Sequence, residues 1–97
     1  MTDDLEGLMA HVEGSGHAFL SAIGPAVVAA TALEICADTR SFARIFEVAH
    51  ALVIRECMSL QEDLGLVTTE DRGEKSLRKF ISLTEAGWAT VARNSLS

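Results

Sequence analysis

The chain has 97 residues and a mass of 10.4 kDa, which is the size of one small domain and excludes a second one. Apolar residues make up 48% of the sequence and charged residues 23%, as in a folded globular protein, so a disordered or low-complexity chain is also excluded. A domain this short buries a small core, and we expect an oligomer to supplement its stability.

The formal net charge of −6 conceals a gradient along the chain. Residues 1–37 carry five acidic side chains and no Lys or Arg, whereas residues 71–97 carry five basic side chains and three acidic ones. An acidic total argues against nucleic acid as a partner. Half of the basic residues, however, lie within eight positions of one another, and this clustering predicts a nucleic-acid contact: Arg72, Lys75, Arg78 and Lys79.

Membrane, secretory and metal-binding features are not expected. Residues 14–33 carry no charge, but they contain Gly, Pro and polar residues and lack flanking basic anchors, so we predict no membrane segment. No basic amino-terminal region of a secretory signal is found, which predicts a cytoplasmic protein. Cys36 and Cys57 are expected to be buried thiols, and no His or Cys spacing indicates a metal or another cofactor.

The predicted elements begin with an amino-terminal helical segment, residues 3–22. Its residues 3–13 are expected to form a short helix, which Gly14-Ser15-Gly16 weakens or breaks. Its first apolar residues follow the spacing of one helix face: Leu5, Leu8, Met9 and Val12. Helices then fill residues 25–64, because Pro25 suits a first helical turn and apolar residues continue at helical intervals. The first of these helices runs to about Ala37 and is apolar almost all round, as in a helix packed centrally.

Two further helices are predicted in this region. Asp38 is the expected N-cap of a helix from Thr39 to Phe46, because its carboxylate can accept hydrogen bonds from free backbone N–H groups. A longer helix follows from about His50 to Leu64. Its predicted inner face consists of Val53, Cys57, Leu60 and Leu64. Its predicted outer face consists of Ala51, Ile54, Arg55, Met58 and Ser59.

From residue 66 to residue 83 the apolar period changes from 3.6 to 2, which predicts a β-hairpin around a polar loop. Thr84 is expected to cap a last helix within residues 84–96, with Trp88 and Val91 facing inward. The expected fold class is therefore α+β and mainly helical. Two helices joined by a short turn and followed by a basic hairpin are typical of a winged helix-turn-helix, whose wing is the two-stranded β-hairpin.

Three motifs occur in order in the second half of the chain: Leu64-Gly65-Leu66-Val67, Glu70-Asp71-Arg72 and Leu83-Thr84-Glu85-Ala86-Gly87. They resemble the Gly-Leu-Val, the acidic-Arg wing tip and the Leu-Thr-x-x-Gly of the MarR family of bacterial transcriptional regulators. The resemblance covers roughly residues 23–90, and the chain is similar to a short member without much of the terminal dimerisation helices. Glu47 stands where the family has Gly, and Ala49 where it has a capping Ser or Thr.

The resemblance implies a sequence-specific DNA-binding transcriptional regulator that acts as a homodimer. The recognition helix would enter the major groove and the wing would contact the backbone and minor groove, with Asp71 orienting Arg72. The expected DNA-binding residues are His50, Ala51, Ile54, Arg55, Met58, Ser59, Arg72, Lys75, Arg78 and Lys79. The expected dimer interface consists of Leu5, Leu8, Met9, Val12, Phe19, Trp88 and Val91.

Plainer interpretations stand beside these. The clustered basic residues of the hairpin could serve only to protect an edge strand from aggregation. Arg55 could form a surface ion pair with Glu56 or Glu62, and His50 could be an ordinary polar residue at a helix end. Trp88 is more plausible as a core anchor than as part of an effector pocket.

A second function class is a winged-helix module that binds a protein, as an adaptor or an antagonist of a regulator. The acidic total and the apolar outer-face residues Ala51, Ile54 and Met58 favour this interpretation. No nucleophile–base pair, paired carboxylates, phosphate-binding loop or dinucleotide motif is found in the sequence. We therefore expect no enzyme and no catalytic residue.

Overall fold

The computed structural model of the protein describes residues 2–72 and 77–92. Its elements are α1 (Thr2–Glu13), α2 (Ile23–Ala32), α3 (Thr39–Phe46), α4 (His50–Glu62), β1 (Val67–Glu70), β2 (Phe80–Leu83) and α5 (Glu85–Val91). The described chain is therefore mixed α+β and mainly helical, which confirms the predicted class.

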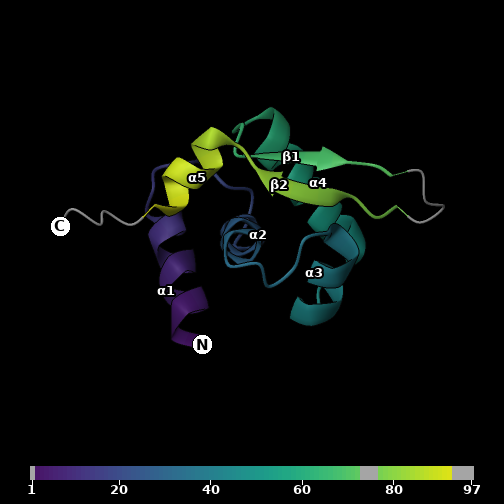
Figure 1. Cartoon of the computed structure of the whole chain (residues 1–97), viewed down its shortest axis with the longest axis horizontal. Coiled ribbons are helices and arrows are strands. Elements are labelled where there is room, and N and C mark those ends of the chain that lie inside the picture. The colour runs from purple at the N-terminus through teal and green to yellow at the C-terminus, as the bar shows by residue number, and fades with distance from the viewer. Residues whose placement is uncertain (1, 73–76, 93–97) are drawn as a thin grey trace.

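Helix α2 is the central element of the structure. It is seen end-on in Figure 1, with α1 and α5 on one side and α3, α4 and the sheet on the other. Every residue from Gly24 to Ala30 is buried, as the prediction of a centrally packed helix requires. Small Ala and Val side chains let the neighbouring elements approach closely, so the core forms around this helix.

The predicted helix over residues 3–13 and the break after it are confirmed, whereas the rest of the segment to residue 22 is not helical and α2 ends earlier than expected. Residues 14–22 form turns and irregular chain, because Gly16 adopts a φ of 96° and the Ser15 hydroxyl donates to the Val12 carbonyl. Helix α2 begins two residues before Pro25 and ends at Ala32. Glu34 takes a left-handed φ of 60° there, which stops the helix.

Helices α3 and α4 are joined by residues 47–49, as predicted. Asp38 caps α3 through a 2.8 Å hydrogen bond from the Ser41 N–H to its Oδ2. Glu47 adopts a left-handed φ of 57°, a conformation that costs a non-glycine residue about 1–2 kcal/mol. Ala49 gives α4 no side-chain cap. The turn is therefore locally unfavourable in free energy, and the packing of both helices must offset this.

The inner face of α4 is confirmed. Val53, Cys57 and Leu60 are at most 1% exposed, and Leu64 packs partly buried against the core just after the helix ends. Cys36 is also buried, and both cysteines are free thiols, as predicted. Burial raises the pKa of the Cys36 thiol to about 11 and that of Cys57 to about 12, so both stay protonated at neutral pH.

The predicted hairpin is present. Strands β1 and β2 pair antiparallel from Val67 opposite Leu83 to Glu70 opposite Phe80, although β2 begins later than residue 77, where the alternation starts. Its base is attached to the chain that leads into α3: the Thr39 N–H donates to the Lys79 carbonyl at 2.9 Å, and the Ile81 N–H donates to the Ala37 carbonyl at 2.8 Å. The start of α3 thus fixes the direction of the hairpin.

The Leu-Thr-x-x-Gly motif has a physical explanation at the start of α5. The Thr84 hydroxyl accepts a hydrogen bond from the Gly87 N–H and donates one to the Gly65 carbonyl. A Cβ at position 87 would collide with the Leu66 carbonyl oxygen, so only glycine allows this approach. Gly87 and Val91 form the inward face, and α5 ends at Val91, within the predicted range. Trp88 lies beside that face and is 52% exposed, so its predicted inward orientation is wrong.

We expect Gly87→Ala to lower the free energy of unfolding by about 2–3 kcal/mol, because α5 must move away from Leu66. Urea denaturation followed by circular dichroism measures the change. Gly14→Ala is the matched control, since its added methyl would meet the nearest atoms at 3.6 Å, an ordinary contact distance. Equal losses in the two variants would contradict this account of the motif.

Candidate nucleic-acid interface

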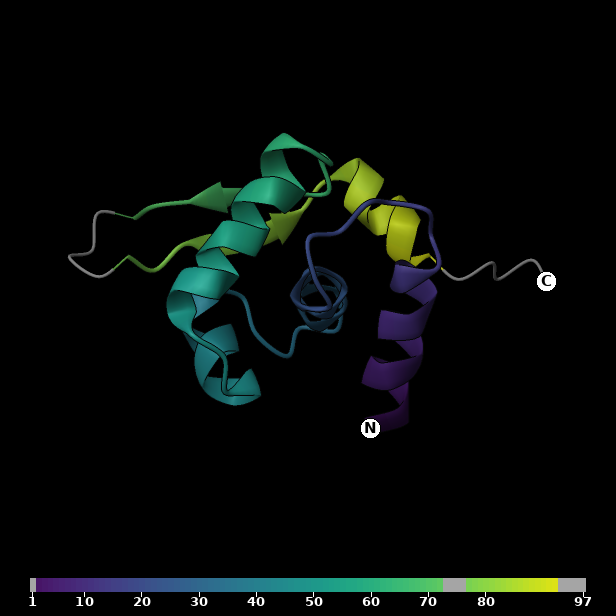
Figure 2. The ribbon, with the colours of Figure 1, turned by 180° about the vertical axis from the view of Figure 1, so that it is seen from behind.

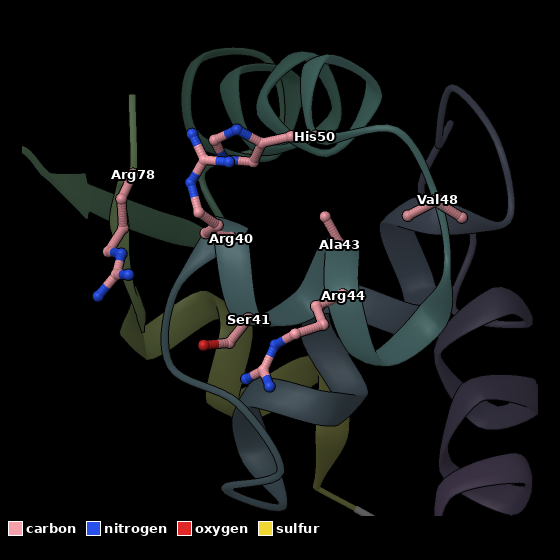
Figure 3. A pocket seen from close by; sticks show the side chains of 7 residues that line it. All are labelled: Arg40, Ser41, Ala43, Arg44, Val48, His50 and Arg78. Carbon is pink, nitrogen blue, oxygen red and sulfur yellow. The ribbon is translucent and has the colours of Figure 1, made fainter. Parts of the chain in front are cut away.

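Basic side chains surround a groove between α3, the first turn of α4 and the chain that precedes β2. We call it the basic groove; its volume is about 490 Å³. Figure 3 shows arginines from two separate parts of the chain around this space. The lining residues are Arg40, Ser41, Ala43, Arg44, Val48, His50 and Arg78. Only His50 and Arg78 among them are predicted DNA-binding residues.

Arg40 and Arg44 are not among the predicted DNA-binding residues. They lie four positions apart on the exposed side of α3, whose opposite side buries Phe42. That i, i+4 spacing was the available signal, because it places two side chains on one helix face. Within the described ranges neither arginine forms an ion pair. The two positive charges are therefore available to an anion.

Arg78 reaches the groove from the hairpin. Its Nε lies 3.6 Å from the Asp38 Oδ2, and this carboxylate also accepts hydrogen bonds from the Ser41 N–H and hydroxyl. Burial tends to raise the pKa of Asp38, but these hydrogen bonds and the Arg78 charge outweigh it and hold the pKa below 3.8. Asp38 therefore stays ionised and offsets one of the three arginine charges.

His50 links the groove to the buried start of α3. Its Nε2 lies 2.8 Å from the Oγ1 of Thr39, a residue with no exposed surface. The pKa of His50 lies below 6.5, first because burial disfavours the charged ring and then because Arg40 and Arg78 repel a further positive charge, although Asp38 acts in the opposite direction. The neutral ring therefore prevails at pH 7 in the free protein.

The predicted outer face of α4 is only partly exposed. Ala51 and Arg55 are exposed and Ile54 and Met58 are half-buried. The outer position of Ser59 is wrong: it is 9% exposed, because the turn after α4 folds back over it and its hydroxyl bonds to Asp63.

The possible partners of Arg55 on α4 do not pair with it in the part of the chain that is described. Glu56 is 4% exposed and does not lie on the outer face. It accepts a 2.8 Å hydrogen bond from the Ser21 hydroxyl, which comes from the loop before α2. Arg55 is the one Lys or Arg of α4, and the adjacent Glu56 does not cancel its charge by an ion pair.

The remaining hairpin cations are placed differently from one another. Arg72 is exposed, lies 3.4 Å from Glu70 and stacks its guanidinium 4.0 Å from the centre of the Phe80 ring. Glu70 makes an ion pair with Arg72, and the orienting role that the resemblance assigns to Asp71 stays a prediction. Lys79 is half-buried, and the predicted contact Lys75 falls outside the described residues.

The predicted dimer residues fall into two groups. Leu8, Val12 and Val91 are at most 8% exposed and belong to the core of the chain itself, which leaves them little surface for a partner. Trp88 is exposed. The half-buried members are Leu5, Met9 and Phe19. An apolar hollow with Trp88 and Leu33 at its edge lies between α1, α2 and α5.

Comparisons with protein-family models, with curated proteins and with solved structures give no significant match. Within residues 2–72 and 77–92, no three or more His, Cys, Asp or Glu side chains come together as metal ligands. No helix in that part of the chain is long and apolar enough to cross a membrane. A functional proposal therefore depends on the geometry of the described surface.

We expect Asp38→Ala to lower the free energy of unfolding by about 1–2 kcal/mol at pH 7, because α3 loses its N-cap. The folded-state pKa of Asp38 lies below the ordinary 3.8, so this stabilisation is complete above that pH and is lost as the pH falls through the folded value. Urea denaturation from pH 7 to pH 3 measures the difference.

Asp38→Asn is the matched control for this prediction. It keeps a capping side chain and removes the charge that faces Arg78. It should lose much less stability at pH 7 than Asp38→Ala does. A deficit of Asp38→Ala that stays constant down to pH 3 would contradict the assignment.

Proposed function

We propose that the protein binds double-stranded DNA as a winged helix-turn-helix transcriptional regulator, of the kind that its resemblance to the MarR family implies. The observation that carries the proposal is the basic groove, which Arg40, Arg44 and Arg78 line and where only Arg78 faces a carboxylate. Arginine presents planar donors that match phosphate oxygens. Helix α4, which begins at the groove, is the proposed recognition helix.

The distribution of charge supports this proposal despite the net charge of −6. Asp4, Glu6 and Glu13 are exposed on α1. In Figures 1 and 2, α1 lies on one side of α2, and α3, α4 and the protruding hairpin lie on the other. The acidic side chains of α1 are thus separated from the basic groove, whereas the exposed Glu47, Glu62 and Glu70 lie on the same side of α2 as the groove. A DNA backbone at the groove itself would meet the positive charges that line it.

In the proposed complex, α4 lies in the major groove with Ala51 and Arg55 toward the base edges. Arg40 and Arg44 contact phosphates, and the hairpin brings Arg72 to the adjacent backbone or minor groove. The apolar hollow between α1, α2 and α5 is the proposed face of a cytoplasmic homodimer. Two-fold symmetry then favours a pseudo-palindromic site with half-sites about one helical turn apart.

We expect a random-sequence duplex pool to bind at about 50 mM salt and to dissociate at about 200 mM, because phosphate contacts release counterions. Arg40→Ala and Arg44→Ala should each weaken binding and each reduce the slope of log K against log salt by about 0.9. Fluorescence anisotropy on protein of checked oligomeric mass measures both quantities.

Ala10→Glu is the matched control, because it changes the net charge by the same amount at an exposed position of α1. It should leave the slope unchanged. The proposal fails if the protein does not bind duplex at 50 mM salt, or if the arginine variants bind as Ala10→Glu does.

The alternative is a winged-helix module that binds a protein instead of DNA. One observation favours it: Leu52 on α4 is 45% exposed and Leu20 is 52% exposed. Both line a hollow of about 220 Å³ together with Ile23. Exposed apolar side chains grouped in this way are a common feature of protein-binding surfaces.

The variant Leu20→Ser/Leu52→Ser separates the two functions, because it removes apolar surface without changing charge. We expect it to keep the duplex affinity of the unmodified protein within about twofold, since phosphate contacts dominate affinity. Anisotropy and a pull-down are measured on the same samples. The alternative is favoured if the unmodified protein binds a protein partner that Leu20→Ser/Leu52→Ser does not bind, and if neither protein binds duplex.

A further inference from the structure

The hydroxyl of Thr39 joins three elements at one buried point. Its Oγ1 accepts a 3.0 Å hydrogen bond from the Lys79 N–H of the hairpin base and lies 2.8 Å from the His50 Nε2 at the start of α4. The backbone N–H of Thr39 donates in turn to the Lys79 carbonyl at 2.9 Å. Thr39 has no exposed surface, so no water can replace these partners without a rearrangement.

This geometry selects one protonation state of His50. A threonine hydroxyl has one hydrogen to donate, and the Lys79 N–H already uses one of its acceptor positions. Its hydrogen needs an acceptor, and the unprotonated Nε2 of His50 lies at the right distance. The network therefore assigns the ring proton of the neutral form to Nδ1. Protonation of Nε2 would take away the acceptor of a buried hydroxyl hydrogen.

The charges that face His50 also oppose its protonation while the groove is empty. Arg40 on α3 and Arg78 from the hairpin oppose it, and Asp38 at the start of α3 acts in the opposite direction. Arg44 lines the same groove. The pKa of His50 is accordingly lowered, first by burial and then by Arg40. An anion placed among the arginines would offset part of this positive charge and so weaken its opposition to the protonated ring.

We propose that the basic groove holds one phosphate group between Arg40, Arg44 and Arg78, and that His50 takes up a proton when the phosphate binds. This inference rests on the proposed function, because it names the part of the nucleic acid that the groove would hold. Thr39 is a positioning residue: it fixes the ring of His50 and ties the hairpin to the same site. Phosphate and proton then bind cooperatively, each increasing the affinity for the other.

The shared chemistry is a phosphate group, which can come from a nucleic-acid backbone or from free phosphate. We therefore use two probes, a short duplex and inorganic phosphate, and follow the ring resonances of His50 by NMR from pH 5 to pH 8. His50→Gln assigns the resonances, and His11 on α1 serves as the internal control. We expect each probe that binds to raise the pKa of His50 by about one unit and to leave His11 unchanged.

Binding measurements give an independent readout. Lowering the pH from 7.5 to 5.5 should strengthen duplex binding more in the unmodified protein than in His50→Gln. The difference should reach up to about tenfold, because a rise of one unit in the pKa of His50 on binding corresponds to a tenfold change in affinity. The backbone diester of DNA does not titrate in this range, so the additional proton comes to the protein. Arg44→Ala should reduce the effect of either probe on His50.

The role of Thr39 is tested by Thr39→Val and Thr39→Ser. Without the hydroxyl, the neutral ring loses its hydrogen-bond donor, so His50 should titrate at a higher pH in free Thr39→Val. Thr39→Ser should restore the original titration and the ¹⁵N pattern of the Nδ1–H form. If Thr39→Val does not fold, the titrations of the unmodified protein and of Thr39→Ser still decide the proposal.

The outcomes separate the two proposals. Salt-dependent duplex binding with no change at His50, and with the same pH dependence in His50→Gln, would overturn the inference and leave DNA binding intact. A response of His50 to inorganic phosphate without any duplex binding would overturn the DNA-binding proposal and support a site for free phosphate. If the protein binds neither the duplex nor inorganic phosphate, both the DNA-binding proposal and the inference about His50 are overturned.

Discussion

The chain at Ala37-Asp38-Thr39 is the junction on which the second half of the structure depends. Two backbone hydrogen bonds attach it to the base of the hairpin, at Lys79 and Ile81. The Asp38 carboxylate caps α3, and the Thr39 hydroxyl reaches α4 at His50. Asp38 and Thr39 are at most 7% exposed, so the loss of one of their bonds leaves a largely buried polar group without its partner. The hairpin and both helices therefore hold one fixed arrangement.

The same junction concentrates positive charge. Arg40 and Arg44 follow it by less than two helical turns, and Arg78 precedes the hairpin residues bonded to it. In a protein with an acidic total, such local fields and not the net charge decide which partner can approach. Our proposal of DNA binding depends on this separation between the groove and the acidic surface of α1.

The turn between α3 and α4 breaks two local rules close to the proposed site. Glu47 occupies a left-handed conformation that glycine adopts without cost, and Ala49 offers α4 no capping oxygen. Departures of this kind gather at functional sites, where the requirements of binding compete with local stability. Leu52 on α4 is a third departure, because a large apolar side chain is exposed there. This exposure is the basis of the alternative proposal.

The sequence by itself determined the elements whose signals are local. The Asp38 and Thr84 caps, the inner face of α4 and the hairpin are set by side chains a few positions apart, so they could be predicted. The irregular chain at residues 17–22 and the early end of α2 could not, because the apolar pattern there suits either helix or packed loop.

Tertiary structure alone decided which side chains meet. Trp88 is exposed because Gly87 and Val91 already fill the contact of α5 with the core, and Ser59 is buried because the turn after α4 folds over it. Arg40 and Arg78 share one groove only because the hairpin is bonded to the start of α3, although 38 positions separate them in the sequence. Periodicity reports one face of one element, and the assembly of a site depends on how separate elements pack.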